Sequence, residues 1–176
     1  RHEWQGWRDG ALRFMTPEGE KLVQADACLL ALGGASWPRL GTDGGWVPIL
    51  TAAGIALTPL RPSNCGFIVP WSDYFRARFA GTPLKNATFT HSGPSKHGEA
   101  VITQHGIEGG AIYALSAGLR DSITAHGSAV LTIDLVPQFS LQQLAAKLTA
   151  PRGSQSASNY LRKTLNLAPV QIGLLH

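Results

Sequence analysis

The chain has 176 residues, of which 44% are hydrophobic and 15% are charged, a balance that supports a packed core and argues against disorder. The formal net charge is +4. The basic residues are scattered, with no run longer than Arg162-Lys163, so we expect no nucleic-acid partner. No apolar run approaches the roughly 20 residues of a membrane span, and we expect no membrane partner and a cytoplasmic location.

The first part of the chain predicts a β-meander of three short strands. His2–Trp7 and Ala11–Thr16 are separated by Arg8-Asp9-Gly10, in which Asp-Gly favours a tight hairpin. A further turn leads to a third strand at Lys21–Ala25. The aromatic residues expected in the core of this meander are Trp4, Trp7 and Phe14.

The next stretch predicts a buried strand that ends in a glycine turn. Ala27–Leu32 is continuously apolar, includes Cys28 as a core residue, and stops at Gly33-Gly34. A helix is expected at Trp46–Ala53, with Asp43 as its N-cap. Paired glycines at the end of a strand allow backbone to approach a nucleotide. The candidate cofactor-binding residues are Gly33, Gly34, Gly41, Thr42, Asp43 and Gly44, with Asp43 favoured as a cap over a ligand.

A proline-stiffened crossing then separates two kinds of pattern. After a short strand at Ile55–Leu57, Pro59–Asn64 favours extended backbone and marks a domain boundary. Beyond it, short β-runs broken by turn residues predict a small antiparallel barrel or sandwich. The strands expected there are Cys65–Pro70, Leu84–Thr90, Gly98–Gln104 and Ser128–Val136, with a loop at His91–His97.

Helices are expected within and after this β-rich region. Ser72 is a possible cap for a short helix or turn over Ser72–Phe79, and Gly109–His126 predicts a long helix that stops at Gly127. From Ser140 the chain turns helical. The expected starts of its pieces are Ser140, Ser158 and Ala168-Pro169.

Several segments resemble the BaiN-like (YhiN-type) family of NAD(P)/FAD-dependent oxidoreductases. The resemblance is carried by LALGGASWPRLGTDGGWVPIL and continues through PLRPSNCGF (59–67), GEAVIT (98–103), GIEGGAIYALS (106–116) and DLVP (134–137). It implies a mixed α+β fold: the C-terminal part of a Rossmann-like FAD domain, with meander, buried strand and helix, followed by a β-barrel-like insert domain with a helical end. The expected domains are 1–60, 61–137 and 138–176.

The resemblance implies FAD as cofactor, NAD(P)H as reductant and a small-molecule substrate with a reducible group such as a carbon–carbon double bond. Two departures stand out. Leu32 replaces the Thr that usually precedes the glycine pair, and the GxGxxG motif that holds the FAD pyrophosphate is absent from the sequence. We therefore expect an internal piece whose partner is a missing N-terminal segment of the same enzyme.

A second glycine-rich junction, His105–Gly110, supplies candidates for contact with substrate or flavin, and a flexible turn without such contact is an equally good interpretation. We expect the junction to lie on the same side as Pro59–Asn64, because ligand sites favour domain interfaces. Arg61, in its stiff Pro-flanked segment, could meet an anionic group, and anchoring the linker to a carboxylate is an equally good interpretation. The cleft candidates are Arg61, Asn64, Gly106, Gly109 and Gly110.

No catalytic acid or nucleophile can be named from the residues. Ser36 and Ser116 each lack one glycine of the GxSxG pattern, and His91 and His97 have no metal-binding partners at ligand spacing. Two functions therefore remain open. One is part of a flavoprotein oxidoreductase, and the other is a non-catalytic insert or interaction domain that covers a cofactor bound elsewhere.

Overall fold

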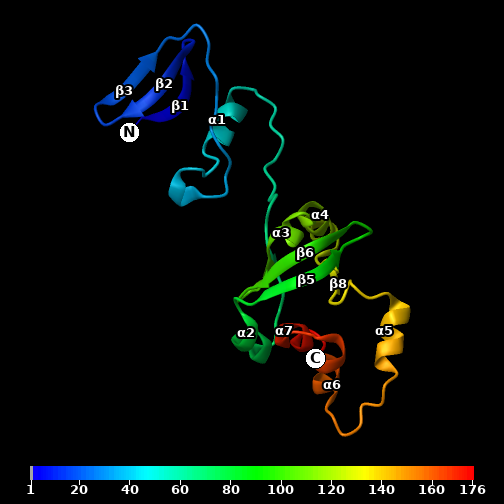
Figure 1. Ribbon diagram of the computed structural model, residues 1–176. Helices are drawn as coiled ribbons and strands as arrows, with labels where there is room; N and C mark the ends of the chain where they lie inside the picture. The colour runs from blue at the N-terminus through cyan, green and yellow to red at the C-terminus, as the bar shows by residue number, and fades with distance from the viewer. Residues whose placement is uncertain (1) are drawn as a thin grey trace. The chain divides into compact units, whose positions relative to one another are not determined.

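The computed structural model describes residues 2–176, which divide into two compact units (Figure 1). The first unit ends at Arg61 and the second is Pro62–His176. Both units combine helices with antiparallel strands, so the expected mixed α+β class is confirmed.

A three-stranded meander opens the first unit, as expected. Strands β1 (Glu3–Arg8), β2 (Ala11–Thr16) and β3 (Gly19–Val23) pair antiparallel in that order. The first turn has φ of 50° at Asp9 and 77° at Gly10, the left-handed pair that a tight hairpin needs. The rings of Trp4 and Trp7 meet edge to face with centroids 5.0 Å apart, although Trp7 remains 38% exposed.

Gly6 allows helix α1 (Trp46–Ala52) to pack closely against β1. It is buried, has a φ of 92°, and lies where the β1–β2 register shifts between Trp4 and Trp7. A Cβ at this position would lie 2.9 Å from Cγ2 of Ile49 on α1. Glycine therefore supplies both the bulge conformation and the space for the helix.

The predicted buried strand at Ala27–Leu32 is wrong for this structure. The segment has no strand assignment, Cys28 is exposed, and Leu29 is 91% exposed. A buried parallel strand needs hydrogen-bonding neighbours and a cover on both faces. Among residues 2–61 the only strands are those of the meander, which ends at Val23. The strand expected at Ile55–Leu57 is likewise absent, and the Rossmann-like part of the expected fold is not shown.

The second unit is built on a five-stranded antiparallel sheet that curls as an incomplete barrel (Figure 1). Its central hairpin is β5–β6, and the strand order is β4-β7-β6-β5-β8. Since β6 begins at Ser95, the loop expected at His91–His97 is shorter than predicted. The bounds are β4 (Phe67–Ile68), β5 (Pro83–Thr90), β6 (Ser95–Ile102), β7 (Gly106–Glu108) and β8 (Thr132–Asp134).

Three of the helices that pack with this sheet around the main core lie between β4 and β8 in the chain. They are α2 (Asp73–Phe79), α3 (Gly110–Tyr113) and α4 (Ser116–His126). The predicted cap is confirmed, since the Ser72 hydroxyl accepts from Phe75 N–H at 3.2 Å. The long helix expected at Gly109–His126 is interrupted between α3 and α4, and it stops at Gly127 as predicted. Completely buried core side chains are Leu84, Ala87, Phe89, Ala100, Ile102 and Ile112.

Ser116 lies at the start of α4, directly after the interruption between α3 and α4. Its hydroxyl donates to the carbonyls of Cys65 and Ile112, each at 3.2 Å, and accepts from Cys65 N–H at 3.4 Å. The side chain is 1% exposed. Ser116 therefore joins the start of α4 to the segment before β4, a contact between residues far apart in sequence.

The C-terminal residues form α5 (Leu141–Leu148), α6 (Ala157–Leu165) and α7 (Pro169–Gly173). The predicted cap Ser140 is confirmed and forms a capping box with Gln143. The predicted cap Ser158 is wrong. Ser156 caps α6 by accepting from Asn159 N–H, because Ser156 has the extended backbone that an N-cap requires, whereas Ser158 lies in the first helical turn.

Removal of the Ser140 cap should destabilise the helical end modestly. Ser140→Ala removes the hydroxyl that accepts from Gln143 N–H at 3.2 Å. We expect the free energy of unfolding to fall by about 1 kcal/mol, measured by urea denaturation. Ser154→Ala, in the exposed segment before α6, is the control and should have no effect. Equal losses in the two variants would contradict the role of the cap.

No helix among residues 2–176 is long and apolar enough to cross a bilayer. The longest one, α4, has 11 residues, whereas a membrane-spanning helix needs roughly 20.

Candidate functional site

The glycine-rich loop that follows Ala27–Leu32 has a defined internal structure. Trp37 and Thr42 form an isolated antiparallel bridge around the short 3-10 helix Pro38–Leu40. The Thr42 hydroxyl donates to the carbonyl of Trp37 at 3.1 Å and accepts from its N–H at 3.1 Å. The predicted cofactor residues Gly41 and Thr42 therefore close a tight loop with few degrees of freedom.

The same loop holds the Gly33-Gly34 turn in place. Gly33 has a φ of 73°, and a Cβ there would lie 3.2 Å from Cγ2 of Thr42. The indole N–H of Trp46 donates to the Gly33 carbonyl at 3.2 Å. A Cβ on Gly44 would lie 3.0 Å from Cβ of Ala35. The structure thus brings the predicted residues Gly33, Thr42 and Gly44 together.

Asp43 does not cap α1, which corrects the sequence prediction. Its Oδ1 accepts from Gly45 N–H at 2.9 Å, and Gly45 is the residue at the N-cap, with no side-chain cap. Two residues, Gly44 and Gly45, separate the aspartate from the start of the helix at Trp46, so the carboxylate lies around the turn instead of over the helix end. A cavity of about 650 Å³ adjoins this turn. It is lined by Gly41, Asp43, Gly45 and Arg39 together with residues from β1 and α1.

The backbone N–H groups of the glycine turn are free to bind a ligand such as a dinucleotide. Within residues 2–176, no hydrogen bond uses the backbone N–H groups of Gly33–Ser36, and Gly33–Ser36 is exposed. A Cβ on Gly34 would meet nothing within 4 Å. Exposed N–H donors beside an open glycine can bind a phosphate, ribose or flavin oxygen.

The predicted junction at His105–Gly110 is largely a packing feature of the sheet. Gly106 is buried, and its carbonyl accepts from Trp71 Nε1 at 3.0 Å and from Thr103 N–H at 2.8 Å. A Cβ on Gly109 would lie 3.0 Å from Cα of Ala100. Gly110 is exposed, with open space where a Cβ would be. Contact of these glycines with substrate stays a prediction.

Arg61 and Asn64 are both exposed. Arg61 ends the first unit and Asn64 lies at the start of the second. The expectation that they and the 105–110 junction wall one cleft therefore stays a prediction.

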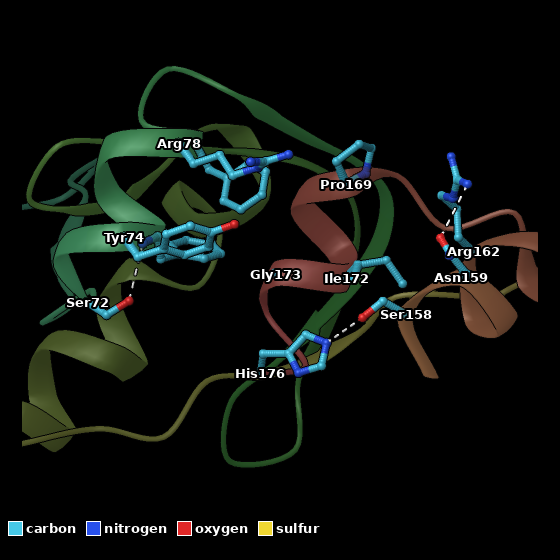
Figure 2. A pocket seen from close by; sticks show the side chains of 12 residues that line it. Ser72, Tyr74, Arg78, Ser158, Asn159, Arg162, Pro169, Ile172, Gly173 and His176 are labelled. Carbon is cyan, nitrogen blue, oxygen red and sulfur yellow. Dashed lines mark hydrogen bonds between the residues drawn. The ribbon is translucent and has the colours of Figure 1, made fainter. Parts of the chain in front are cut away.

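A pocket that the sequence did not suggest lies between α2 and the α6–α7 pair, with a volume of about 510 Å³. Figure 2 shows Tyr74 and Arg78 reaching from α2 toward the gap, with Pro169 and Ile172 of α7 opposite them. Arg162 of α6 lies on the far side. No sequence motif could have indicated this pocket, because its walls come from residues about 90 positions apart.

The comparison with protein families decides the identity of the second unit. The model described as the HI0933-like protein barrel and H2TH domain matches residues 61–175. The chain belongs to the HI0933-like family. This is the family of BaiN/YhiN-type flavoprotein oxidoreductases, so the resemblance found in the sequence is confirmed at family level. A search of curated proteins finds no significant match.

The HI0933-like match includes the curled sheet and the helices that surround it. It spans β4 to β8 and continues through α5, α6 and α7. The expected barrel-like domain with a helical end is consistent with this description. Family membership associates the chain with flavoproteins and thus suggests a flavin cofactor. Within residues 2–176, no three His, Cys, Asp or Glu side chains cluster as metal ligands.

Proposed function

We propose that the chain is part of an FAD-dependent oxidoreductase and supplies one wall of the FAD site. In this proposal NAD(P)H reduces the flavin, which then reduces a small-molecule substrate, such as one with a carbon–carbon double bond. FAD, when bound, supplies the hydride chemistry, and the protein supplies binding and orientation. The observation that carries the proposal is the open turn at Gly33-Gly34, in a chain of a flavoprotein family.

The role of this turn is to bring backbone donors close to the cofactor. Gly34 has no side chain to hold the ligand away, and the N–H groups of Gly33–Ser36 are exposed. Thr42 and Trp46 fix Gly33 from two directions, so binding costs little ordering entropy. Leu32, in the place of the usual Thr, offers no hydroxyl. The contact is therefore made by backbone alone.

The exposed apolar segment Ala27–Leu32 supports the further proposal that another part of the same enzyme completes the FAD domain. Leu29 is 91% exposed, and an apolar run of this kind is typical of a strand in a parallel sheet. We propose that a segment carrying GxGxxG pairs with it and binds the pyrophosphate at a helix N-terminus. The 176-residue chain by itself should then bind FAD weakly.

Gly34→Val in the full-length protein tests the proposal. A β-branched side chain at this open position should clash with the cofactor and weaken FAD binding by at least about tenfold, while the fold survives. Flavin content after dialysis and fluorescence titration with FAD provide the measurements. Ala25→Val, also at an exposed position, is the control for added bulk. If Gly34→Val retains stoichiometric flavin and an unchanged affinity for FAD, the proposal is wrong.

The alternative is a non-catalytic insert or interaction domain that covers a cofactor bound elsewhere. It is favoured by the range of the family match, which covers residues 61–175 and leaves out the glycine-rich loop. The same titration distinguishes the two. A Gly34→Val enzyme that remains yellow and active would show that the turn does not contact the flavin. It would support the alternative, in which the barrel unit covers a cofactor bound elsewhere.

A further inference from the structure

We propose that the pocket between α2 and the α6–α7 pair binds a phosphorylated nucleoside, with its phosphate held by Arg78 and Arg162 and its base near Tyr74. The pocket belongs to the second unit and shares no residue with the glycine-rich loop. The proposal therefore stands independently of the proposed flavin site.

The charge of the pocket is not neutralised by its own residues. Arg78 forms no hydrogen bond or ion pair with any of residues 2–176 and lies over the rings of Tyr74 and Phe79, at 6.0 and 5.8 Å. Within residues 2–176, the one hydrogen bond of the Arg162 side chain is to Asn159 Oδ1, at 3.5 Å. By contrast, the neighbouring Arg76 pairs with Asp73. Two arginines without carboxylate partners in one pocket favour a multiply charged anion such as phosphate.

The surroundings reinforce this positive potential. No Asp or Glu lines the pocket. The sequence from residue 138 to 176, which forms α5, α6 and α7, contains no acidic residue, whereas it includes Lys147, Arg152, Arg162 and Lys163. An anion entering from this side meets basic groups alone, which raises its local concentration and its rate of association.

The apolar part of the pocket suits a flat ring. Tyr74 is 70% exposed and projects toward the gap, and Pro169 and Ile172 form the opposite wall (Figure 2). Stacking on an exposed tyrosine is the usual way in which proteins bind a base without reading its identity. A hydrogen-bonded pair, Ser158 Oγ with His176 Nε2 at 2.8 Å, lies at the rim and adds polar groups for a ribose.

The volume of the pocket favours a mononucleotide over a nucleic-acid strand. A volume of about 510 Å³ lies within the range of small-molecule sites and can hold a mononucleotide. A nucleic-acid strand needs a basic groove that follows several successive phosphates. Here Arg78 and Arg162, neither of which has a carboxylate partner, line opposite sides of one pocket, which suits a single bound nucleotide.

The test is isothermal titration of the whole chain with AMP, with adenosine and ribose 5-phosphate as partial ligands. We expect saturable binding of AMP and weaker binding of each partial ligand. Arg78→Gln and Arg162→Gln should each weaken AMP binding about tenfold. Tyr74→Ala should weaken AMP binding about fivefold without changing the affinity for ribose 5-phosphate. The matched control is Arg152→Gln, an exposed arginine outside the pocket, which should bind AMP normally.

Two further measurements distinguish AMP binding in this pocket from AMP binding at the glycine turn and from loss of the fold. Gly34→Val should leave AMP binding unchanged, which excludes binding of AMP at the proposed flavin site. Circular dichroism melting of each arginine variant verifies the fold, and both arginines are exposed, so their loss should not unfold the protein.

Three results would overturn the proposal. The first is the absence of saturable AMP binding to the folded chain. The second is an equal loss in Arg152→Gln and in the two pocket variants, since it would indicate only general surface charge. The third is binding of a single-stranded oligonucleotide much more tightly than AMP with no dependence on Arg78, because the site would then be a nucleic-acid surface elsewhere.

Discussion

Gly106→Ala is expected to release β4 from the sheet and to lower the free energy of unfolding by about 3 kcal/mol. The added Cβ would lie well inside contact distance of the Phe67 carbonyl oxygen, 2.8 Å from its carbonyl carbon and 2.9 Å from Cα of Ile68. All three atoms are backbone, so no side-chain rotation can relieve the clash. Gly106 is the register partner of Ile68, and the β4–β7 pairing must therefore separate.

Urea denaturation of Gly106→Ala measures this loss, and hydrogen exchange locates it. We expect the amides of Phe67 to Val69 to lose protection, since Val69 N–H bonds to the His105 carbonyl beside this pair. Gly110→Ala is the matched control, because its Cβ would meet nothing within 4 Å. A Gly106→Ala variant as stable as Gly110→Ala would contradict the packing argument.

The tight packing of Gly106 limits what its substitution can reveal about the predicted substrate cleft. A loss of activity in Gly106→Ala would be explained by the damaged sheet and would say little about substrate contact. Gly110 is exposed and its substitution has space, so it is the more informative position of the two.

Gly173→Val is expected to detach α7 from α2 and to cost about 2 to 3 kcal/mol of stability. A Cβ at Gly173 would lie 2.6 Å from Cε2 of Phe79, and 2.9 and 3.2 Å from Cε2 and Cδ2 of Phe75. Both rings are 6% exposed and packed against each other with centroids 4.9 Å apart. They have little room to move away, so the close approach of α7 depends on glycine.

A double-mutant cycle with Phe79→Leu checks this interpretation. Leucine at position 79 removes the nearest ring, so Gly173→Val should cost less in that background than in the natural chain. Urea denaturation of the four proteins gives the coupling energy. Additive losses would show that Gly173 does not contact Phe79. Because Gly173 also lines the pocket of Figure 2, AMP binding should weaken together with stability.

Local signals in the sequence determined much of the secondary structure. The Asp9-Gly10 turn, the caps Ser72 and Ser140 and the stop at Gly127 are all as predicted. In each case the turn or cap bonds to residues at most four positions away, so the local sequence contains the whole interaction. The resemblance to a flavoprotein family is equally a property of the sequence, and the family match over residues 61–175 agrees with it.

Only the tertiary structure decided the features that depend on distant partners. Ala27–Leu32 has the composition of a buried strand but lies exposed, because a strand exists only where neighbours pair with it. Ser116, at the break before α4, bonds to Cys65, which lies 51 positions away in the sequence, and Gly173 lies close against the rings of α2. Arg78 and Arg162 line the same pocket because α2 lies beside the α6–α7 pair in the fold. Its chemistry arises from side chains that the fold brings together, and no segment of the sequence contains it.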